Sequence, residues 1–234
     1  MNRDLVCSVL AWMVGFAGLP LSLGAEEQSR YGYVETLNPV EFHAPADGEA
    51  VQIVEDGKAV ATVVVPDGKV KDKRSDERRA ADELIEHVKL STGVELPLVE
   101  ASKAPAKGDL IVIGDSPPAR KTGVRTDGLP DEGFRVRTVR VGKRDLLVIV
   151  GSSAGGNGVR FGVCDVLERF VGVRWYYPGP DGRVVPEHQT LAVKPVHYTD
   201  APMVLKRTGL PGRGDIMTHY RVGNSSPVTG SPCH

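Results

Sequence analysis

The stretch with the clearest chemical potential is a glycine-rich loop, GSSAGGNG, at residues 151–158. It joins an apolar segment, residues 146–150, to a helical pattern that begins near Asn157. A strand, a glycine loop and a helix N-terminus in this order form the anion-binding geometry of nucleotide-binding proteins. The loop therefore raises the question of whether the chain binds a phosphate.

The spacing around this loop argues against a nucleotide. Gly158 is followed by Gly162 rather than by a glycine three residues on, and no Lys-Ser or Lys-Thr pair follows as in a P-loop. The next predicted strand, residues 173–177, does not end in the Asp or Glu that would hold a ribose. We therefore predict no cofactor, and we expect the glycines to allow sharp turns and close helix–sheet packing.

Catalytic and metal-binding patterns are weak. Ser152 and Ser153 do not stand in a G-x-S-x-G elbow. The six histidines are scattered, with no pair at a metal-ligand spacing on a helix, so we predict no metal site. We expect the nearby acids to be solvated charges or turn formers rather than catalytic groups. These acids are Asp165, Glu168, Asp181 and Glu187.

Composition indicates an ordinary soluble globular protein, because 41% of the 234 residues are hydrophobic and 25% are charged. The formal net charge of -1 gives no reason to expect nucleic acid or an anionic membrane as a partner. Cys164 falls inside a predicted helix, where we expect a buried and inert thiol. The alternative is a disulfide with Cys233.

The N-terminus is typical of an export signal. Arg3 precedes an apolar run, residues 5–19, and the small-residue end Ser22-Leu-Gly-Ala25 follows. We interpret residues 1–25 as a signal peptide, which predicts a secreted or periplasmic protein. The run is shorter than the ~20 apolar residues of a spanning helix, so we expect no membrane span after cleavage.

Hydrophobic patterning predicts an α+β fold. One amphipathic helix, residues 75–93, has Ser75 as its N-cap and Gly93 as its stop, and we expect no site on its charged outer face. A second helix, residues 157–170, ends at Gly172. The predicted strand segments are a hairpin at 50–65 with an Asp56-Gly57 turn, an edge strand at 94–99, a central strand at 109–114 and a long hairpin at 133–150.

These elements suit a two-layer α/β sandwich, in which a mixed, mostly antiparallel sheet carries both helices on one face. We place the domain at residues 49–195, after a lead-in segment at 26–48. The remaining residues, 196–234, show little periodicity, and we expect an irregular tail there.

Three runs resemble the N-terminal domain that precedes the catalytic barrel in certain glycoside hydrolases. They are RRAADELIEHVKLSTGVELPLV (78–99), DLIVIG (109–114) and the run from LLVIVGSSAGGNG to GVRWYYPGPDGRVVP (146–186). The families are the α-glucuronidases and the family 20 β-N-acetylhexosaminidases. The resemblance covers residues 75–195 and implies a noncatalytic two-layer module that lies against a (β/α)₈ barrel.

A shorter run, APMVLKRTG at residues 201–209, is similar to the start of the first barrel strand in the hexosaminidases. An arginine there hydrogen-bonds sugar hydroxyls, and Pro202 and Arg207 occupy the corresponding places, with Thr208 intervening before Gly209. The resemblance thus makes Arg207 a candidate sugar-binding residue, and its guanidinium offers five donors for that role. The alternative is a surface arginine.

Trp175 is the other candidate binding residue. An indole face is a good platform for a sugar ring, and its N–H can donate a hydrogen bond. The alternative is that Trp175, Tyr176 and Tyr177 pack at a domain junction, where large aromatic side chains are common. An apolar patch around these three residues, normally covered by a barrel, is then expected.

The expected function follows from the resemblance. It implies the noncatalytic N-terminal part of a secreted glycoside hydrolase-like protein in glycan degradation, inactive alone. Its expected partner is a catalytic barrel encoded separately, because a barrel needs about 250 residues. The alternative is a free-standing carbohydrate-binding or protein-interaction module. A nucleotide-dependent enzyme is the third hypothesis.

Overall fold

The structure is a computed structural model that describes residues 41–43, 50–154, 156–202 and 219. The predicted signal peptide and Arg207 lie outside the described residues, as does most of the predicted tail. All described residues belong to one unit of the chain, Leu37–His234. Within them, no helix is both long and apolar enough to cross a bilayer.

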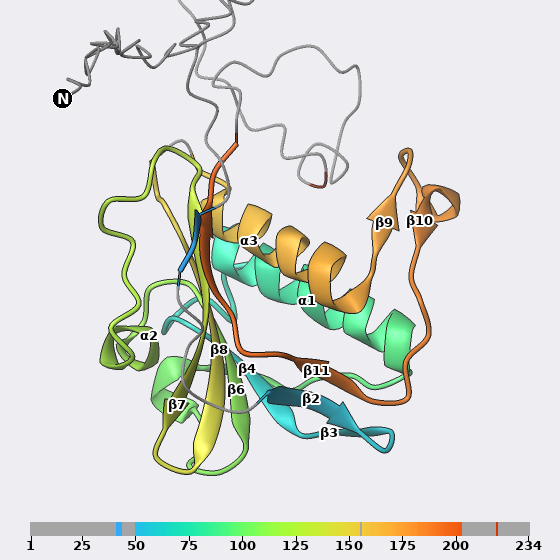
Figure 1. The fold of residues 1–234 in the computed structure, drawn as a ribbon, viewed down its shortest axis with the longest axis horizontal. Helices are drawn as coiled ribbons and strands as arrows, with labels where there is room; N and C mark the ends of the chain where they lie inside the picture. Colours follow the sequence, from blue (N-terminus) through green and yellow to red (C-terminus); the bar gives the residue numbers. More distant parts are fainter. Residues whose placement is uncertain (1–40, 44–49, 155, 203–218, 220–234) are drawn as a thin grey trace, which may run out of the picture. The chain divides into compact units, whose positions relative to one another are not determined.

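A seven-stranded sheet forms the centre of the fold (Figure 1). From one edge to the other its strands are β1 (Glu41–Phe42), β12 (His197–Asp200), β7 (Phe134–Val141), β8 (Arg144–Gly151), β6 (Asp109–Ile113), β4 (Ala61–Val65) and β5 (Leu98–Glu100). The pairs from β8 to β5 are parallel, whereas the pairs from β8 to β1 are antiparallel. The predicted edge strand, central strand and long hairpin are confirmed as β5, β6 and β7–β8.

Two helices cover one face of this sheet, α1 (Asp76–Thr92) and α3 (Gly158–Val166), as Figure 1 shows. A π-helical turn, Leu167–Val171, extends α3, and Gly172 ends it with a φ of 87°. Both helices bury apolar side chains against the sheet in the larger of two hydrophobic clusters. The predicted α+β class, with two helices on one face of a mixed sheet, is confirmed.

The ends of α1 follow from its sequence. Ser75 Oγ accepts a hydrogen bond of 3.3 Å from the Arg78 N–H, which satisfies one of the free donors of the first turn. Gly93 takes a φ of 75°, and its N–H donates to the Lys89 carbonyl at 2.8 Å. A side chain at Gly93 would be strained in this conformation, so the glycine ends the helix.

The opposite face of the sheet is partly covered by a short helix, α2 (Pro117–Lys121), in the segment between the predicted strands 109–114 and 133–150. Its Ala119 packs with Val124 against the smaller hydrophobic cluster, which is formed by β4, β6 and β8. The sequence did not reveal this helix, because it has only five residues and begins with two prolines. The sheet is therefore sheltered on both faces, as parallel strands require.

The predicted hairpin at residues 50–65 is correct only in its first half. β2 (Val51–Glu55) pairs with β3 (Lys58–Ala59) through a turn in which Asp56 and Gly57 have φ values of 47° and 72°. β4 then leaves this pair and enters the main sheet, parallel to β5 and β6. The reason is that β4 buries valines on both of its faces, which suits a central strand rather than a hairpin arm.

The sheet also extends past both predicted domain boundaries. β12 lies in the segment that was expected to be an irregular tail, and β1 lies in the expected lead-in. β12 pairs with β7 along four residues, and β1 pairs with the outer side of β12. Both strands are short and carry polar residues, so their periodicity was too brief to predict a strand. A third short strand, β11 (Leu191–Val193), pairs with β2 beside the main sheet.

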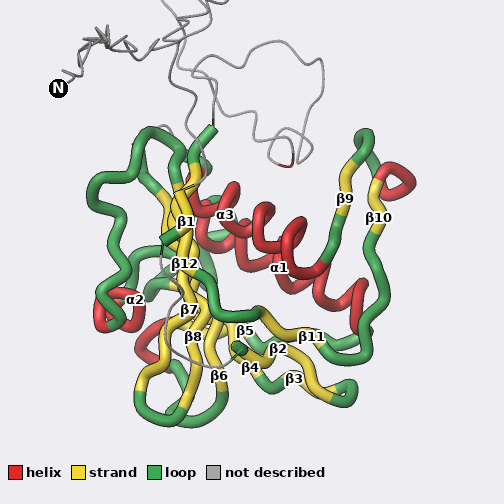
Figure 2. The backbone as a smooth tube through the Cα atoms, in the orientation of Figure 1, coloured by secondary structure: helices red, strands yellow, loops and turns green. Residues whose placement is uncertain are grey.

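A small arm projects from the end of the helical layer (Figures 1 and 2). It consists of β9 (Arg174–Trp175) and β10 (Arg183–Val184), which pair antiparallel. Trp175 at its base is 8% exposed, whereas Tyr176 and Tyr177 beyond it are 65% and 54% exposed. We call the residues from 174 to 184 the aromatic arm.

Gly151 and Gly158 in the loop at 151–158, and Gly162 in α3, allow close packing, as predicted. A Cβ at Gly151 would lie 2.0 Å from the Val159 nitrogen, and one at Gly158 would lie 2.7 Å from the Gly133 carbonyl oxygen. A Cβ at Gly162 would meet Ile149 at 2.8 Å. The start of α3 thus rests directly on the backbone of the sheet, which only glycine permits.

Candidate functional site

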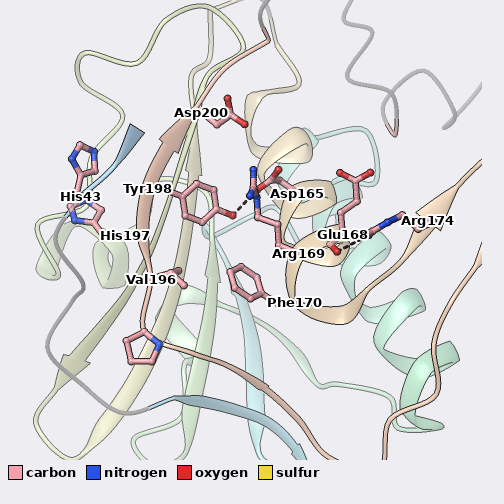
Figure 3. Close-up of a pocket in the computed structure, with 11 residues that line it drawn as sticks. His43, Asp165, Glu168, Arg169, Phe170, Arg174, Val196, His197, Tyr198 and Asp200 are labelled. Carbon is pink, nitrogen blue, oxygen red and sulfur yellow. Dashed lines mark hydrogen bonds and ion pairs between the residues drawn. The ribbon is translucent and has the colours of Figure 1, made fainter. Parts of the chain in front are cut away.

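A pocket of about 800 Å³ opens between the end of α3 and β12 (Figure 3). Its lining combines acidic, basic and aromatic side chains from elements far apart in the sequence. The residues are His43, Asp165, Glu168, Arg169, Phe170, Arg174, Pro195, Val196, His197, Tyr198 and Asp200.

Asp165 lies at the centre of this pocket and is only 2% exposed. Its Oδ2 accepts 2.7 Å hydrogen bonds from Arg169 Nε, one helical turn later, and from the hydroxyl of Tyr198 on β12. The Arg169 guanidinium also lies 5.3 Å from the centre of the Tyr198 ring. The prediction that Asp165 is a solvated charge is therefore wrong, because β12, which was not predicted, covers that side of the helix.

These contacts shift two pKa values. Burial, followed by the negative charge and hydrogen bond of Asp165, raises the pKa of the Tyr198 phenol, so it remains a donor. Burial alone would lower the pKa of Arg169, but its hydrogen bond and ion pair with Asp165 outweigh burial, and the pKa is raised. Tyr198, Asp165 and Arg169 thus form a buried link between β12 and α3.

His197 and His43 lie side by side at one margin of the pocket, with ring centres 4.4 Å apart. Burial and, after it, the charges of Arg137, His43 and Arg135 together lower the pKa of His197 to about 4. His197 is therefore neutral near pH 7, and it can accept or donate a hydrogen bond there without adding charge.

The pocket has a donor at its rim, and the carboxylate of Asp165 is engaged by its neighbours. Arg174 Nη1 donates to the Glu168 and Val173 carbonyls at 2.7 Å, which fixes its guanidinium beside the opening. Such a group can bind a hydroxyl or a carboxylate. Glycoside hydrolysis requires two carboxyl groups facing one bond, and Asp165 is instead occupied by Arg169 and Tyr198. Glu168 and Asp200 also line the pocket.

A second cluster surrounds Trp175 at the base of the aromatic arm. The His219 imidazole stacks on the indole, with ring centres 4.3 Å apart and an angle of 14° between the planes. His219 Nε2 is 2.8 Å from Glu83 Oε1 on α1. His87, one turn after Glu83, meets the Trp175 ring edge-on at 5.3 Å. We call Glu83, His87, Trp175 and His219 the tryptophan cluster.

Burial and neighbouring groups shift the pKa values of Glu83 and His87 in this cluster. Burial would raise the pKa of Glu83, but the hydrogen bond and charge of His219 outweigh burial, and the pKa is lowered. Burial lowers the pKa of His87, which is 1% exposed, although its Nδ1 lies 2.8 Å from the Glu83 carbonyl oxygen. The expectation that the charged face of α1 carries no site stays a prediction, but His87 is buried and Glu83 is paired with His219. Glu83 and His87 stand four residues apart on a helix, a spacing that could have indicated that they lie close together.

The two predicted binding residues have different outcomes. Trp175 is largely buried, and one face of its ring is covered by His219 rather than open to a ligand. Arg207 lies outside the described residues. Sequence reasoning missed Glu83 and His219. No local pattern marks His219, because it contacts Trp175 although the two residues are 44 positions apart in the sequence.

A smaller pocket of about 480 Å³ lies beside the glycine loop. Its lining includes Lys69 and Arg74 but also four carboxylates, Asp72, Asp76, Glu77 and Asp115. The carboxylates repel an anion, so this pocket does not favour a phosphate. Among the described residues, no group of three His, Cys, Asp or Glu side chains could hold a metal ion.

No family model matches the chain, and no curated protein matches it.

Proposed function

We propose that this chain is the noncatalytic N-terminal domain of a secreted glycoside hydrolase-like protein, and that it supports a separately encoded catalytic barrel in glycan degradation. The observation that carries the proposal is the aromatic arm, which presents Tyr176, Tyr177 and Val184 at exposures of 65%, 54% and 51%. Exposed aromatic side chains that project together from a fold are characteristic of docking surfaces.

Hydrogen bonds within the arm order its backbone turn and the Tyr177 ring. The Tyr176 N–H donates to the Gly182 carbonyl at 2.8 Å, and the Tyr177 hydroxyl donates to the Asp181 carbonyl at 2.9 Å. A Cβ at Gly182 would lie 2.0 Å from the Tyr177 carbonyl oxygen, so the turn closes tightly. A surface that is already ordered loses little conformational entropy when a partner binds.

Two internal features support a scaffold role. Gly151 and Gly158, in a loop of the kind that binds phosphate in other folds, serve here for close backbone packing at the start of α3. The buried carboxylate of Asp165 joins α3 to β12. The predicted signal peptide, residues 1–25, adds export to the secreted or periplasmic space as part of the proposal.

The test begins with the genomic DNA around the codon for His234, where the proposal expects an adjacent reading frame that encodes a (β/α)₈ barrel. The two chains are then co-expressed and purified through a tag on the barrel. The wild-type chain should co-purify, and a variant with Tyr176→Ser and Tyr177→Ser should not. Lys58→Ser, an exposed change on β3, is the matched control.

A barrel that fails to retain the wild-type chain would contradict this docking role. So would a barrel that retains the double-tyrosine variant as well as it retains the wild type, because the arm would then be irrelevant to the contact.

A second candidate function is a free-standing carbohydrate-binding module. The observation that favours it is the tryptophan cluster, which sets a carboxylate, Glu83, beside the stacked face of Trp175. An aromatic platform with an adjacent polar group is a suitable arrangement for a sugar ring. Binding of the purified chain to an array of glycans tests this candidate, and no binding to any glycan would contradict it.

A further inference from the structure

The side chains around Trp175 have the features of a built site. Trp175 is packed in the main hydrophobic cluster and is 8% exposed, yet its Nε1 has no hydrogen-bond partner among the described residues. Buried donors in folded proteins are normally satisfied, so an indole N–H without an acceptor requires an explanation. A ligand that supplies an acceptor is one explanation that can be tested.

His219 makes the contacts that a ligand would make in this site. Its flat ring lies on the indole at 4.3 Å, and its Nε2 approaches Glu83 Oε1 at 2.8 Å. A pyranose ring can make both contacts, because its C–H face stacks on an indole and its hydroxyls donate to carboxylates. The imidazole thus covers the platform that a sugar would need.

The unsatisfied indole N–H discriminates between ligand classes. An ammonium or imidazolium ion could stack on Trp175 and pair with Glu83, but it has no acceptor to offer Nε1. A sugar hydroxyl both donates and accepts, so a polyhydroxyl ligand that stacks on the indole and extends past its edge can satisfy Glu83 and the in-plane N–H of Trp175 together. Arg183, whose Nη1 lies 3.4 Å from His87 Nε2 and 2.6 Å from Glu86 Oε1, adds a donor group beside the site.

We propose that Trp175 and Glu83 form a pyranose-binding site that His219 of the same chain occupies, so that the imidazole and a sugar compete for one face of the indole. This inference rests on the second candidate function, carbohydrate binding, and adds that His219 regulates that binding. When a competing group fills a site, the apparent affinity falls by the fraction of molecules in which the site is open. His219 therefore acts as an intramolecular inhibitor of sugar binding.

The experiment uses the full chain with Trp12→Phe, which leaves Trp175 as the single tryptophan of the two in the sequence. Cellohexaose, xylohexaose and chitohexaose are titrated against this protein, and indole fluorescence and calorimetry report binding. We expect His219→Ala to tighten the affinity for at least one of these sugars by about tenfold, because the stacked and hydrogen-bonded competitor is removed. Adding Trp175→Leu, which keeps apolar bulk in the core, should abolish that binding.

His43→Ala is the matched control, because His43 contacts His197 in the other pocket, and it should leave the affinity unchanged. Unfolding curves for each variant establish that it is folded. Equal sugar affinity in the wild type and His219→Ala would overturn the competition while leaving the carbohydrate-binding function standing. Failure of both proteins to bind any of the sugars would overturn the inference and that function together. Binding of imidazole, but of no sugar, to His219→Ala would overturn the pyranose assignment.

Discussion

The hydroxyl of Tyr198 on β12 donates a 2.7 Å hydrogen bond to the carboxylate of Asp165 on α3, and both side chains are at least 98% buried. This contact joins a strand near residue 200 to the helix that packs on the sheet. It also determines how the acidic pocket should be interpreted, because the same Asp165 oxygen accepts a hydrogen bond from Arg169. The carboxylate acts as a structural connector.

Removing the Tyr198 hydroxyl should destabilise the fold measurably. Tyr198→Phe leaves one hydrogen bond of a buried carboxylate unmade, and we expect the free energy of unfolding to fall by about 1–3 kcal/mol. Asp165→Asn removes the charge that pairs with the partly exposed Arg169. We therefore expect it to lower the free energy of unfolding at least as much as Tyr198→Phe does. Urea denaturation measures both.

A double-mutant cycle isolates the Tyr198–Asp165 contact, and its coupling free energy should be at least about 0.5 kcal/mol. Tyr177→Phe is the control, because its exposed hydroxyl bonds only the nearby Asp181 carbonyl, and we expect a change within about 0.5 kcal/mol. Additive effects of the two buried substitutions would contradict the direct link.

Gly151 is expected to tolerate no side chain. In Gly151→Ala the new Cβ would lie 2.0 Å from the Val159 nitrogen, so α3 would have to move away from the sheet. Overpacking of this kind costs about 1–3 kcal/mol or more, and a backbone contact leaves little room for relaxation. We expect a loss at the upper end of this range or a failure to fold.

The control for that substitution is Gly142→Ala, where the φ of 65° is unfavourable but no atom lies within 4 Å of the new Cβ. Its loss should be about 1–2 kcal/mol, from backbone strain alone. Thermal unfolding compares the two variants. A smaller loss for Gly151→Ala than for Gly142→Ala would show that helix–sheet contact does not explain the glycine loop.

His197 should titrate near pH 4 rather than at its ordinary 6.5, because burial and nearby positive charges disfavour its protonated form. Between these pH values the unfolded chain binds more protons at this residue than the folded chain does. The contribution of His197 to stability is therefore fully present above about pH 6.5 and is lost as the pH falls toward 4.

Histidine NMR titration measures this pKa directly, and His197→Gln assigns the signal. The variant should also show a shallower loss of stability from pH 6.5 to 4 than the wild type does. A midpoint near pH 6.5 for the assigned signal would contradict the claim that burial and nearby positive charges lower the pKa of His197.

Periodicity predicted those parts of the fold in which a long element buries one face. The amphipathic α1, with Ser75 and Gly93 at its ends, and the β7–β8 hairpin are of this kind. The sequence did not predict β12 or the transfer of β4 to the main sheet, because strand pairing depends on contacts between distant segments. The contacts at the two candidate sites were the hardest to predict, because they join distant segments: Tyr198 contacts Asp165, and His219 stacks on Trp175.

Turnover by the purified chain is the sharpest test of the proposal that it supports glycan degradation without performing the cleavage. The assay uses aryl glycosides and glucuronoxylan as substrates, with Asp165→Asn and Glu168→Gln as variants of the acidic pocket. We expect no turnover above the buffer blank for any of the three proteins. Robust hydrolysis by the wild type that is lost in either variant would contradict it.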